Sequence, residues 1–469
     1  MAFIGYAAGF SQRHMSKVES PYCPYEATLR TGNLVRSPVT LELIENDILE
    51  FNGPYIPRPD SNLFDAVVRD AYKAFGLPTL VNPIHLNDLA YMPMDTDGSS
   101  PGLPWKEYGF RTKGEVKRDP HAWNSIRTFW HRVKYGSPPA PPDCAAYLRA
   151  HLVEEGKQKV RAVWGYPATI SFQEACFAIP LINAYKIKGP IAYGYETARG
   201  GCRKLAARFA KHSNFLSSDY RKFDKTIPSW LIRIAFDILC SNIDFTKYQD
   251  VGVPHSRSLH QAWLYLVDYF IRTPVRLCNG RRYRKNRGVA SGSYFTQLVD
   301  SIVNWIVTTY SIRSQQVKVE DILVMGDDSL VATNEPVDMQ RFASKAAECG
   351  MIINTDKTQS SSNVHELKFL GYYINYGVPK RDAIDLWAAL RFPERPDYTF
   401  NDFASRTLGL MIANFGVDYD FDLCCRNILN VRSYRVVYSP HLKRFLKILG
   451  IDALPSEPPS VFRLGLMRY

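Results

Sequence analysis

The clearest pattern of apolar and polar positions along this chain lies at residues 322–332. Four apolar residues lead into Gly326, the adjacent acids Asp327 and Asp328 follow, and a second apolar run begins at Leu330. This order predicts a strand, a tight turn and a strand, with Gly326 supplying backbone angles that other residues avoid. Neighbouring carboxylates repel each other, and a divalent cation would offset that repulsion. The turn is therefore either a metal-binding site or an acidic hairpin tip without function.

The spacing of apolar residues predicts further elements. Steps of three and four residues indicate helices at 62–75, 229–240, 295–306, 339–349 and 403–414, and a shorter one at 386–390. Extended runs indicate strands at 214–219, which ends in Asp219, and at 367–374. Asn279-Gly280 between two extended runs predicts a hairpin. The helices after residue 382 suggest a separate C-terminal substructure.

One predicted helix carries a polar stripe. Thr296, Asp300 and Asn304 fall at i, i+4 and i+8, so they share one side of the 295–306 helix. If the stripe faces a site, it would recognise a polar ligand. If it faces water, it has no binding role, and the pattern alone leaves both interpretations open.

Two segments are rich in basic residues. Lys157, Lys159 and Arg161 would share one face of an extended strand. Either that face is solvated, or it holds an anion such as a nucleoside triphosphate or a nucleic-acid backbone. Residues 281–287, which include Arg282 and Arg284, form the second segment, and a nucleic-acid contact explains it at least as well as a solvated charge run.

Composition bears on the partner, on metal or redox motifs and on the compartment of the protein. The 469 residues include 58 Lys and Arg against 46 Asp and Glu, a net charge of +12 that favours a polyanionic partner. Nine scattered cysteines without a Cys-x-x-Cys pair argue against a zinc ribbon or redox motif and suit a reducing compartment. We find no apolar run of transmembrane length and no good signal peptide, so we expect an intracellular aqueous space or the inside of a particle.

The order of these motifs along the chain is more specific than any one of them. A basic segment precedes Asp-x-x-x-x-Asp at 219–224; then come Ser-Gly-x-x-x-Thr at 291–296, Gly-Asp-Asp at 326–328, a Lys after an Asp at 357, and Phe-Leu-Gly at 369–371. In this order the sequence resembles a viral RNA-dependent RNA polymerase of the picornavirus-like group. Residues 292–304 are most similar to the partitivirus (cryptic virus) and picobirnavirus branch. The resemblance is sharp over about residues 157–374.

The resemblance implies an α+β fold shaped as a right hand of fingers, palm and thumb, with an antiparallel palm sheet flanked by helices. The implied parts are an N-terminal extension with fingers (1–170), a first palm part (171–247), a fingers insertion (248–287), a second palm part (288–382) and a thumb (383–469).

It also implies roles for residues of this chain. Two Mg²⁺ ions, for which Mn²⁺ can substitute, would be bound by Asp219, Asp327 and Asp328. Lys357 would be the general acid, and Lys157, Lys159 and Arg161 would hold the nucleotide phosphates. Ribose selection would fall to Asp224, Thr296, Asp300 and Asn304. Template and primer RNA would contact Ser99, Gly102, Ser291, Gly292, Arg282, Arg284, Phe369 and Leu370.

Asp300 departs from the picornavirus pattern, which has Asn at this position. An Asp300 that faces Asp224 would form a like-charge pair. Such a pair needs a proton, a Lys or a metal nearby, so the role of Asp300 in ribose selection stays open. The partitivirus-like branch carries this Asp, which we interpret as a variation of that branch.

The implied function is template-directed RNA synthesis from ribonucleoside triphosphates, which transcribes and replicates a viral, double-stranded RNA genome. The expected partners are RNA template and product, ribonucleotides and a viral capsid protein, without a membrane, in the virion interior or host cytoplasm. Reverse transcription is disfavoured because Met325-Gly326 precedes the acids and Asp224 occupies the sugar-selecting position. A structural RNA-binding protein, such as a capsid component, would explain the charge but not the ordered acids and Lys357.

Overall fold

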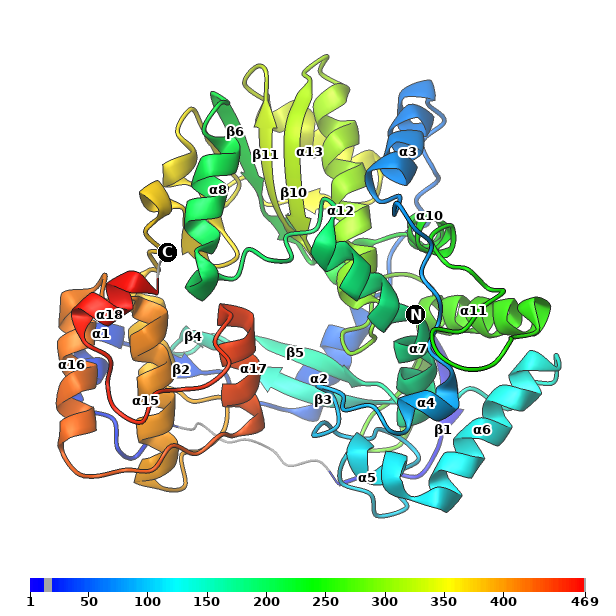
Figure 1. The fold of residues 1–469 in the computed structure, drawn as a ribbon, viewed down its shortest axis with the longest axis horizontal. Coiled ribbons are helices and arrows are strands. Elements are labelled where there is room, and N and C mark those ends of the chain that lie inside the picture. Colours follow the sequence, from blue (N-terminus) through cyan, green and yellow to red (C-terminus); the bar gives the residue numbers. More distant parts are fainter. Residues whose placement is uncertain (12–18, 468–469) are drawn as a thin grey trace.

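The computed structural model describes residues 1–11 and 19–467, so residues 12–18 and 468–469 of the predicted first and last parts lie outside it. Its centre is a four-stranded antiparallel sheet, which we call the palm sheet (Figure 1). In spatial order its strands are β10 (Val319–Met325), β11 (Asp328–Thr333), β6 (Asn214–Ser218) and β13 (Gln359–Ser361). The predicted antiparallel palm sheet is confirmed.

Alternation along these strands buries both faces of the palm sheet. Ile322 and Val324 belong to the main core, which includes the inner face of α12 (Thr296–Arg313). Leu323 and Leu330 point to the other face and join a smaller cluster with α8 (Gly201–Phe209). Successive strand side chains point to opposite faces, so a sheet that is apolar on both needs helices on both. The α+β arrangement follows from this pattern.

A second sheet has the order β1-β9-β8-β3-β5 and forms the fingers sheet. Its strands are β1 (Ala2–Tyr6), β9 (Arg281–Arg284), β8 (Pro274–Arg276), β3 (Cys144–Ala150) and β5 (Val160–Gly165). β8 and β9 form the hairpin predicted at Asn279-Gly280, where Gly280 has φ 90°. The helices around this sheet are α2 (Leu41–Leu49), α4 (Leu86–Leu89), α5 (Lys113–Arg118), α6 (Pro120–Lys134), α7 (Ala168–Ile187) and α11 (Ser256–Ile271).

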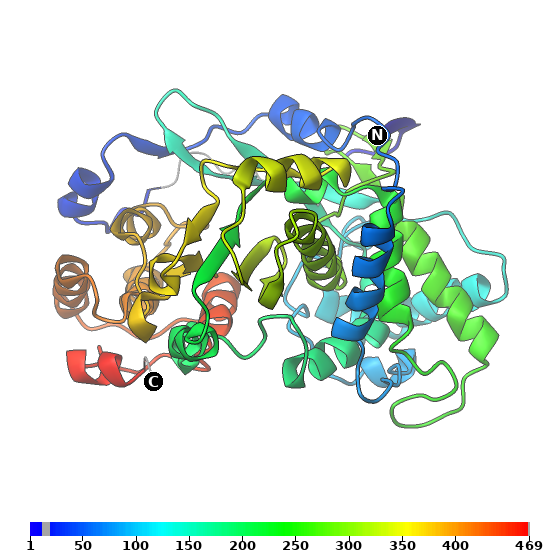
Figure 2. The same cartoon turned by 90° about the horizontal axis from the view of Figure 1, so that it is seen from above.

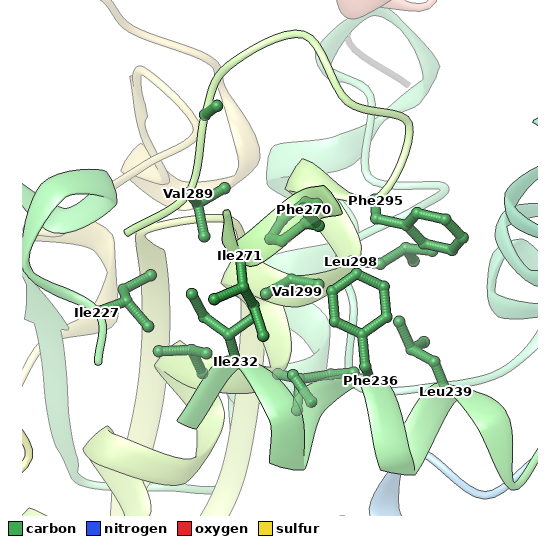
Figure 3. Close-up of a cluster of buried hydrophobic side chains, with 14 of the residues drawn as sticks. Ile227, Ile232, Phe236, Leu239, Phe270, Ile271, Val289, Phe295, Leu298 and Val299 are labelled. Carbon is green, nitrogen blue, oxygen red and sulfur yellow. The ribbon is translucent and has the colours of Figure 1, made fainter. Parts of the chain in front are cut away.

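The core beneath the palm is built by helices far apart in the sequence. α3 (Asn62–Ala74) packs beside α10 (Ser229–Cys240) and α12 (Figure 2). The Phe64 ring lies edge-on to Trp230 and Tyr310. Phe236 of α10 meets Phe270 of α11 and Phe295 at the start of α12, with ring centroids 4.9 and 5.2 Å apart (Figure 3). Such edge-to-face aromatic pairs stabilise a core beyond area burial alone. They fix the end of α12 that carries the predicted polar stripe.

The C-terminal part is helical, as predicted, and forms its own core (Figure 1). Its helices are α14 (Ala383–Arg391), α15 (Phe400–Asn414), α16 (Tyr419–Asn430), α17 (Pro440–Leu449) and α18 (Val461–Leu466). The helix expected at 386–390 is α14, and the one expected at 403–414 is α15. α13 (Met339–Glu348) covers the palm beside α12.

The N-terminal segment joins the fingers sheet to the C-terminal helices. After β1, α1 (Tyr25–Thr31) packs on α14, and β2 (Leu34–Arg36) then pairs with β4 (Leu152–Glu154) beside the fingers sheet (Figure 1). Arg36 donates to the Phe392 carbonyl at 2.7 Å, and Arg391 donates to Thr31 Oγ1 at 2.9 Å. Buried guanidinium groups hold their geometry through such bonds. We call residues 19–36 the N-terminal bridge.

Among the helices that the structure describes, we find none both long and apolar enough to cross a membrane.

Candidate active site

The acids predicted from the sequence meet at one end of the palm sheet. The last pair of the β10–β11 hairpin is Met325 with Asp328, which leaves Gly326 and Asp327 as the turn. Gly326 has φ 63°, as the predicted tight turn requires. Ser329 of β11 pairs with Ser218 of β6, and Asp219 directly follows β6. The antiparallel register therefore brings Asp219 beside Asp328 and the turn.

A short loop holds Asp219 in place. The Asn354 side chain donates to Asp219 Oδ2 at 2.8 Å, and the Asn354 amide donates to the Asp219 carbonyl at 2.8 Å. The Asp219 amide donates to Thr358 Oγ1 at 3.1 Å. Lys357 lies in this same loop with an exposed side chain. Sequence reasoning singled out Lys357 but missed Asn354 and Thr358, whose polar side chains flank it.

The three carboxylates influence one another strongly. Loss of hydration, and then the charges of Asp327 and Asp219, raise the pKa of Asp328 to about 7. Loss of hydration and the charge of Asp219 also raise the pKa of Asp327, whereas the charge of Arg161 lowers it. Both side chains remain accessible to solvent at the turn. The turn therefore concentrates negative charge where a solute can reach it.

This donor set fits a hard divalent cation. Carboxylate oxygens are the protein ligands that Mg²⁺ prefers, and a bound cation would relieve the repulsion that raises the pKa of Asp328. Within residues 1–11 and 19–467, no three His, Cys, Asp or Glu side chains converge tightly enough to hold one ion by themselves. Asp327 and Asp328 lie at an exposed edge of the palm sheet.

A second pair of acids lies behind the first. Burial raises the pKa of Asp300 well above its usual range, and the charges of Asp224 and Asp327 raise it further. Burial and the charge of Asp327 raise the pKa of Asp224 to about 6. Asp300 is 5% exposed, and its Oδ1 has no hydrogen-bond partner within the described structure. Asp224 and Asp300 therefore form the like-charge pair foreseen from the sequence, and burial disfavours its doubly ionised state.

The rest of the predicted polar stripe faces inward. Thr296 Oγ1 donates to the Ala290 carbonyl at 3.0 Å. Asn304 is fully buried; its Nδ2 donates to the Gly326 carbonyl at 3.0 Å, and its Oδ1 accepts from Thr308 at 2.9 Å. Both polar atoms of Asn304 are thus used within the protein. Asn304 thus supports the acidic turn from below, and its part in ribose selection stays a prediction.

The structure separates the three predicted phosphate-binding cations. β5 begins at Val160, so Lys157 and Lys159 lie in the loop before it, and the prediction that all three share one strand face is wrong. Gly156 with φ 87° turns the chain there, and Lys157 pairs with Glu154. Arg161 lies on the exposed side of β5, and its charge lowers the pKa values of Asp224 and Asp327. Arg161 is therefore within electrostatic range of the acids.

The predicted template loop is held firmly by its own chain. Lys113 Nζ donates to the Ser100 carbonyl at 3.2 Å and to Ser99 Oγ at 3.3 Å. Gly102 has φ 68°, and a Cβ there would lie 2.8 Å from Pro167 Cα. The close backbone approach is therefore made by residues 166–167 at the start of α7.

We expect Gly102→Ala to lower the free energy of unfolding by about 2–4 kcal/mol, because it combines backbone strain with a clash that the backbone must relieve. Thermal or denaturant unfolding measures the change. Gly98→Ala is the matched control, since a Cβ there meets nothing within 4 Å. A Gly102→Ala protein as stable as the Gly98→Ala protein would contradict the expectation.

The loop before α12 is pinned to β5. The Trp164 amide donates to Ser291 Oγ at 3.4 Å, and a Cβ on Gly292 would lie 2.3 Å from the Trp164 carbonyl oxygen. Glu174 is fully buried and accepts from Ser293 Oγ at 2.7 Å and from the Tyr294 amide at 3.0 Å. Its burial raises the pKa of Glu174 to about 8. The sequence offered no signal for this acid, because it lies within an apolar helix.

Two predicted RNA contacts are altered by the packing. Phe369 ends β14 (Lys368–Phe369) and is 3% exposed, so its side chain is unavailable to RNA and only Leu370 of the pair can reach it. Leu370 begins the turn to β15 (Tyr372–Tyr373), and its amide lies against Asp328. Arg282 forms a bidentate pair with Asp143 at 2.8 and 2.9 Å, whereas Arg284 is exposed. The RNA roles of Leu370 and Arg284 stay predictions.

Solved structures share this fold. The polymerase of a human picobirnavirus matches 87% of this chain and 78% of its own with a TM-score of 0.66 and 16% identity. The Sicinivirus RNA-dependent RNA polymerase matches 96% of this chain and 99% of its own with a TM-score of 0.72 and 15% identity. The predicted right-hand architecture of fingers, palm and thumb is confirmed.

Comparisons of the sequence with known proteins also find viral RNA polymerases. The RNA-directed RNA polymerase of Cryptosporidium parvum virus 1 is 29% identical over 352 residues, which cover 69% of this chain and 64% of the relative. The polymerase of Atkinsonella hypoxylon virus is 27% identical, and the match covers 60% of this chain and 49% of the relative. The polymerase of White clover cryptic virus 1 is 26% identical, and the match covers 55% of this chain and 46% of the relative. The matches thus span about half to under two thirds of these relatives' lengths. Residues 20–418 match the family described as viral RNA-dependent RNA polymerase, and this chain belongs to that family.

Proposed function

We propose that this chain is an RNA-directed RNA polymerase that joins ribonucleoside triphosphates on the RNA template of a double-stranded RNA virus. The observation that carries the proposal is the meeting of Asp219, Asp327 and Asp328 at one end of the palm sheet, with Arg161 within electrostatic range. Phosphoryl transfer needs charge neutralisation and positioning more than covalent chemistry. An acidic edge opposed by a cation supports that kind of reaction.

Asp219, Asp327 and Asp328 would hold two Mg²⁺ ions, or Mn²⁺ in their place. When bound, the ions would activate the attacking 3′-oxygen and stabilise the leaving pyrophosphate. Arg161 would neutralise the triphosphate from β5, and the exposed Lys357 Nζ would donate a proton to the pyrophosphate. Asn354 and Thr358 would keep Asp219 and the Lys357 loop together. Lys159 stays a candidate for a more distant phosphate contact.

The proposal also includes the partners of the chain and the bounds of its fingers, palm and thumb. The template and product would be RNA, and a viral capsid protein would be a neighbour in the virion interior or host cytoplasm. The similarity to polymerases of a cryptic virus supports this setting. The parts are proposed as 1–170 and 248–287 for the fingers, 171–247 and 288–382 for the palm, and 383–469 for the thumb.

Purified protein, Mg²⁺, a defined single-stranded RNA and labelled nucleotides test the function. The expected product is RNA complementary to the template. Preferential use of deoxynucleotides would favour reverse transcription. RNA binding without incorporation would favour a structural role, and either outcome would overturn the proposal.

Asp300 provides a test of ribose selection. A protonated Asp300 can both donate and accept, as a ribose 2′-hydroxyl does, and Asn keeps both abilities. We therefore expect Asp300→Asn to keep the ratio of kcat/KM for UTP over dUTP within about threefold. Asp300→Leu removes both abilities and should lower that ratio by about tenfold or more. Single-nucleotide incorporation kinetics measure the ratio, and an unchanged ratio in Asp300→Leu would assign Asp300 to packing alone.

A further inference from the structure

The backbone of the acidic turn is held at two points by α12. The Gly326 amide donates to Ser301 Oγ at 2.9 Å, and the Gly326 carbonyl accepts from Asn304 Nδ2 at 3.0 Å. Ser301 Oγ in turn donates to the Gln297 carbonyl at 2.7 Å, so its lone pair is directed at Gly326. Ser301 and Asn304 are both fully buried. The residue directly before Asp327 therefore has its amide and its carbonyl fixed by one helix.

Asn304 also reaches the strand that carries the other acid. Its Oδ1 accepts from Thr308 Oγ1 at 2.9 Å and from the Tyr220 hydroxyl at 3.4 Å. The Tyr220 hydroxyl also lies 2.9 Å from Thr308 Oγ1, and its single proton can go to either of these two acceptors, so three polar side chains meet here. Tyr220 directly follows Asp219. One buried amide thus touches the segment of Asp219 and the segment of Asp327.

Apolar side chains lie next to this network. The neighbouring positions of α12, Ile302, Val303 and Ile306, are fully buried apolar side chains. A polar group in such a core is unfavourable unless its hydrogen bonds are made, and an apolar residue of similar volume would pack there without that requirement. Packing alone therefore does not explain an amide at position 304.

Geometry supplies an explanation. The strand pairing of Ser218 with Ser329, whose hydroxyls are 2.5 Å apart, sets the spacing of β6 and β11 but leaves the turn at Gly326 beyond the last pair. Misplacing reacting groups by about 1 Å can slow a reaction about 100-fold. A contact that spans both acid-bearing segments is suited to prevent such a shift.

We propose that Ser301 and Asn304 are positioning residues that set the separation of Asp219 and Asp327, with Asn304 linking the two segments. The inference rests on the proposed function, in which these acids bind the divalent ions. Neither residue touches nucleotide or metal; both act through the backbone of Gly326, and Asn304 also through Tyr220.

The test compares Ser301→Ala and Asn304→Leu with Thr309→Val. Thr309 is a fully buried residue of the same helix whose hydroxyl has no hydrogen-bond partner within the described structure, so it is a matched control. Thermal unfolding establishes that each variant is folded. Mn²⁺ binding to the nucleotide-free protein, followed by electron paramagnetic resonance, reports the acids without relying on catalysis.

We expect Asn304→Leu and Ser301→Ala to weaken Mn²⁺ binding about fivefold or more and to lower kcat by about 10- to 100-fold, with the KM for nucleotides within about threefold of wild type. Thr309→Val should change none of these values. Folded variants with wild-type Mn²⁺ binding and kcat would overturn the proposal, and Ser301→Ala decides it if Asn304→Leu does not fold. A wild-type protein that binds Mn²⁺ but makes no RNA would refute the proposed function, and the binding data would still decide the positioning role.

Discussion

Replacing Asp327 by Asn should lower nucleotide incorporation by about 10³-fold or more. Asp327 occupies the turn of the β10–β11 hairpin, where its carboxylate is accessible and close to Asp219. Asn keeps the shape of the side chain but removes the charge that would hold a divalent ion. Template-dependent extension of a labelled RNA measures the loss.

The fold should survive this change. Loss of hydration and a neighbouring carboxylate raise the pKa of Asp327, so its charged form is less favourable in the folded than in the unfolded chain at neutral pH. We therefore expect the melting temperature of Asp327→Asn to equal or exceed that of wild type. Asp356→Asn is the control, since that exposed acid pairs with Arg221 and lies in the Lys357 loop. Equal RNA synthesis by wild type and Asp327→Asn would refute the catalytic assignment.

Arg161→Ala should raise the KM for ribonucleoside triphosphates by about 10- to 100-fold, the range expected when a charged hydrogen-bonding group of 1.5–3 kcal/mol is lost. The Arg161 side chain lies on the exposed face of β5, and its charge acts on Asp224 and Asp327. A guanidinium can bind phosphate oxygens through two parallel hydrogen bonds. Steady-state kinetics at saturating template measure the effect.

Lys157→Ala is the matched control for Arg161→Ala. Both substitutions remove one positive charge, but Lys157 lies in the loop before β5 and pairs with Glu154. Exposed pairs of this kind contribute little, so the KM should change by less than about threefold. Equal effects of the two substitutions would mean that overall charge, and not the position of Arg161, governs nucleotide binding.

Local patterns predicted the local structure well. The helix expected at 229–240 is α10 with the same bounds, and the strand–turn–strand at 322–332 is the β10–β11 hairpin. The period of apolar residues in the helix, and the apolar runs around Gly326 in the hairpin, are properties of a short segment. The meeting of Asp219 with Asp327 followed only from the family resemblance, because strand pairing across the sheet is not visible in either segment alone.

Long-range contacts, and one local turn, account for what the sequence patterns missed. Phe369 was expected at RNA but is 3% exposed, because β14 packs over the palm sheet. For Asn304, the sequence could not show that its side-chain amide donates to the carbonyl of Gly326 at the hairpin tip. The start of β5 was misplaced because alternating basic residues imitate a strand that Gly156 interrupts. The partners of Phe369 and Asn304 lie in other parts of the sequence, whereas the turn at Gly156 is local.

The N-terminal bridge has a topological consequence. Fingers and thumb are connected through the palm and again through residues 19–36, whose contacts include Arg36 with the Phe392 carbonyl and Arg391 with Thr31 (Figure 1). Residues 19–36 thus make a second connection between these regions. Arg149 with Glu394 and Lys447 with Asp95 add further contacts between the fingers region and the C-terminal helices, so the two regions separate only if several contacts break. For the RNA of the proposed function, a linear strand could be threaded between them by its free end, whereas a covalently closed circle could enter only when these contacts open.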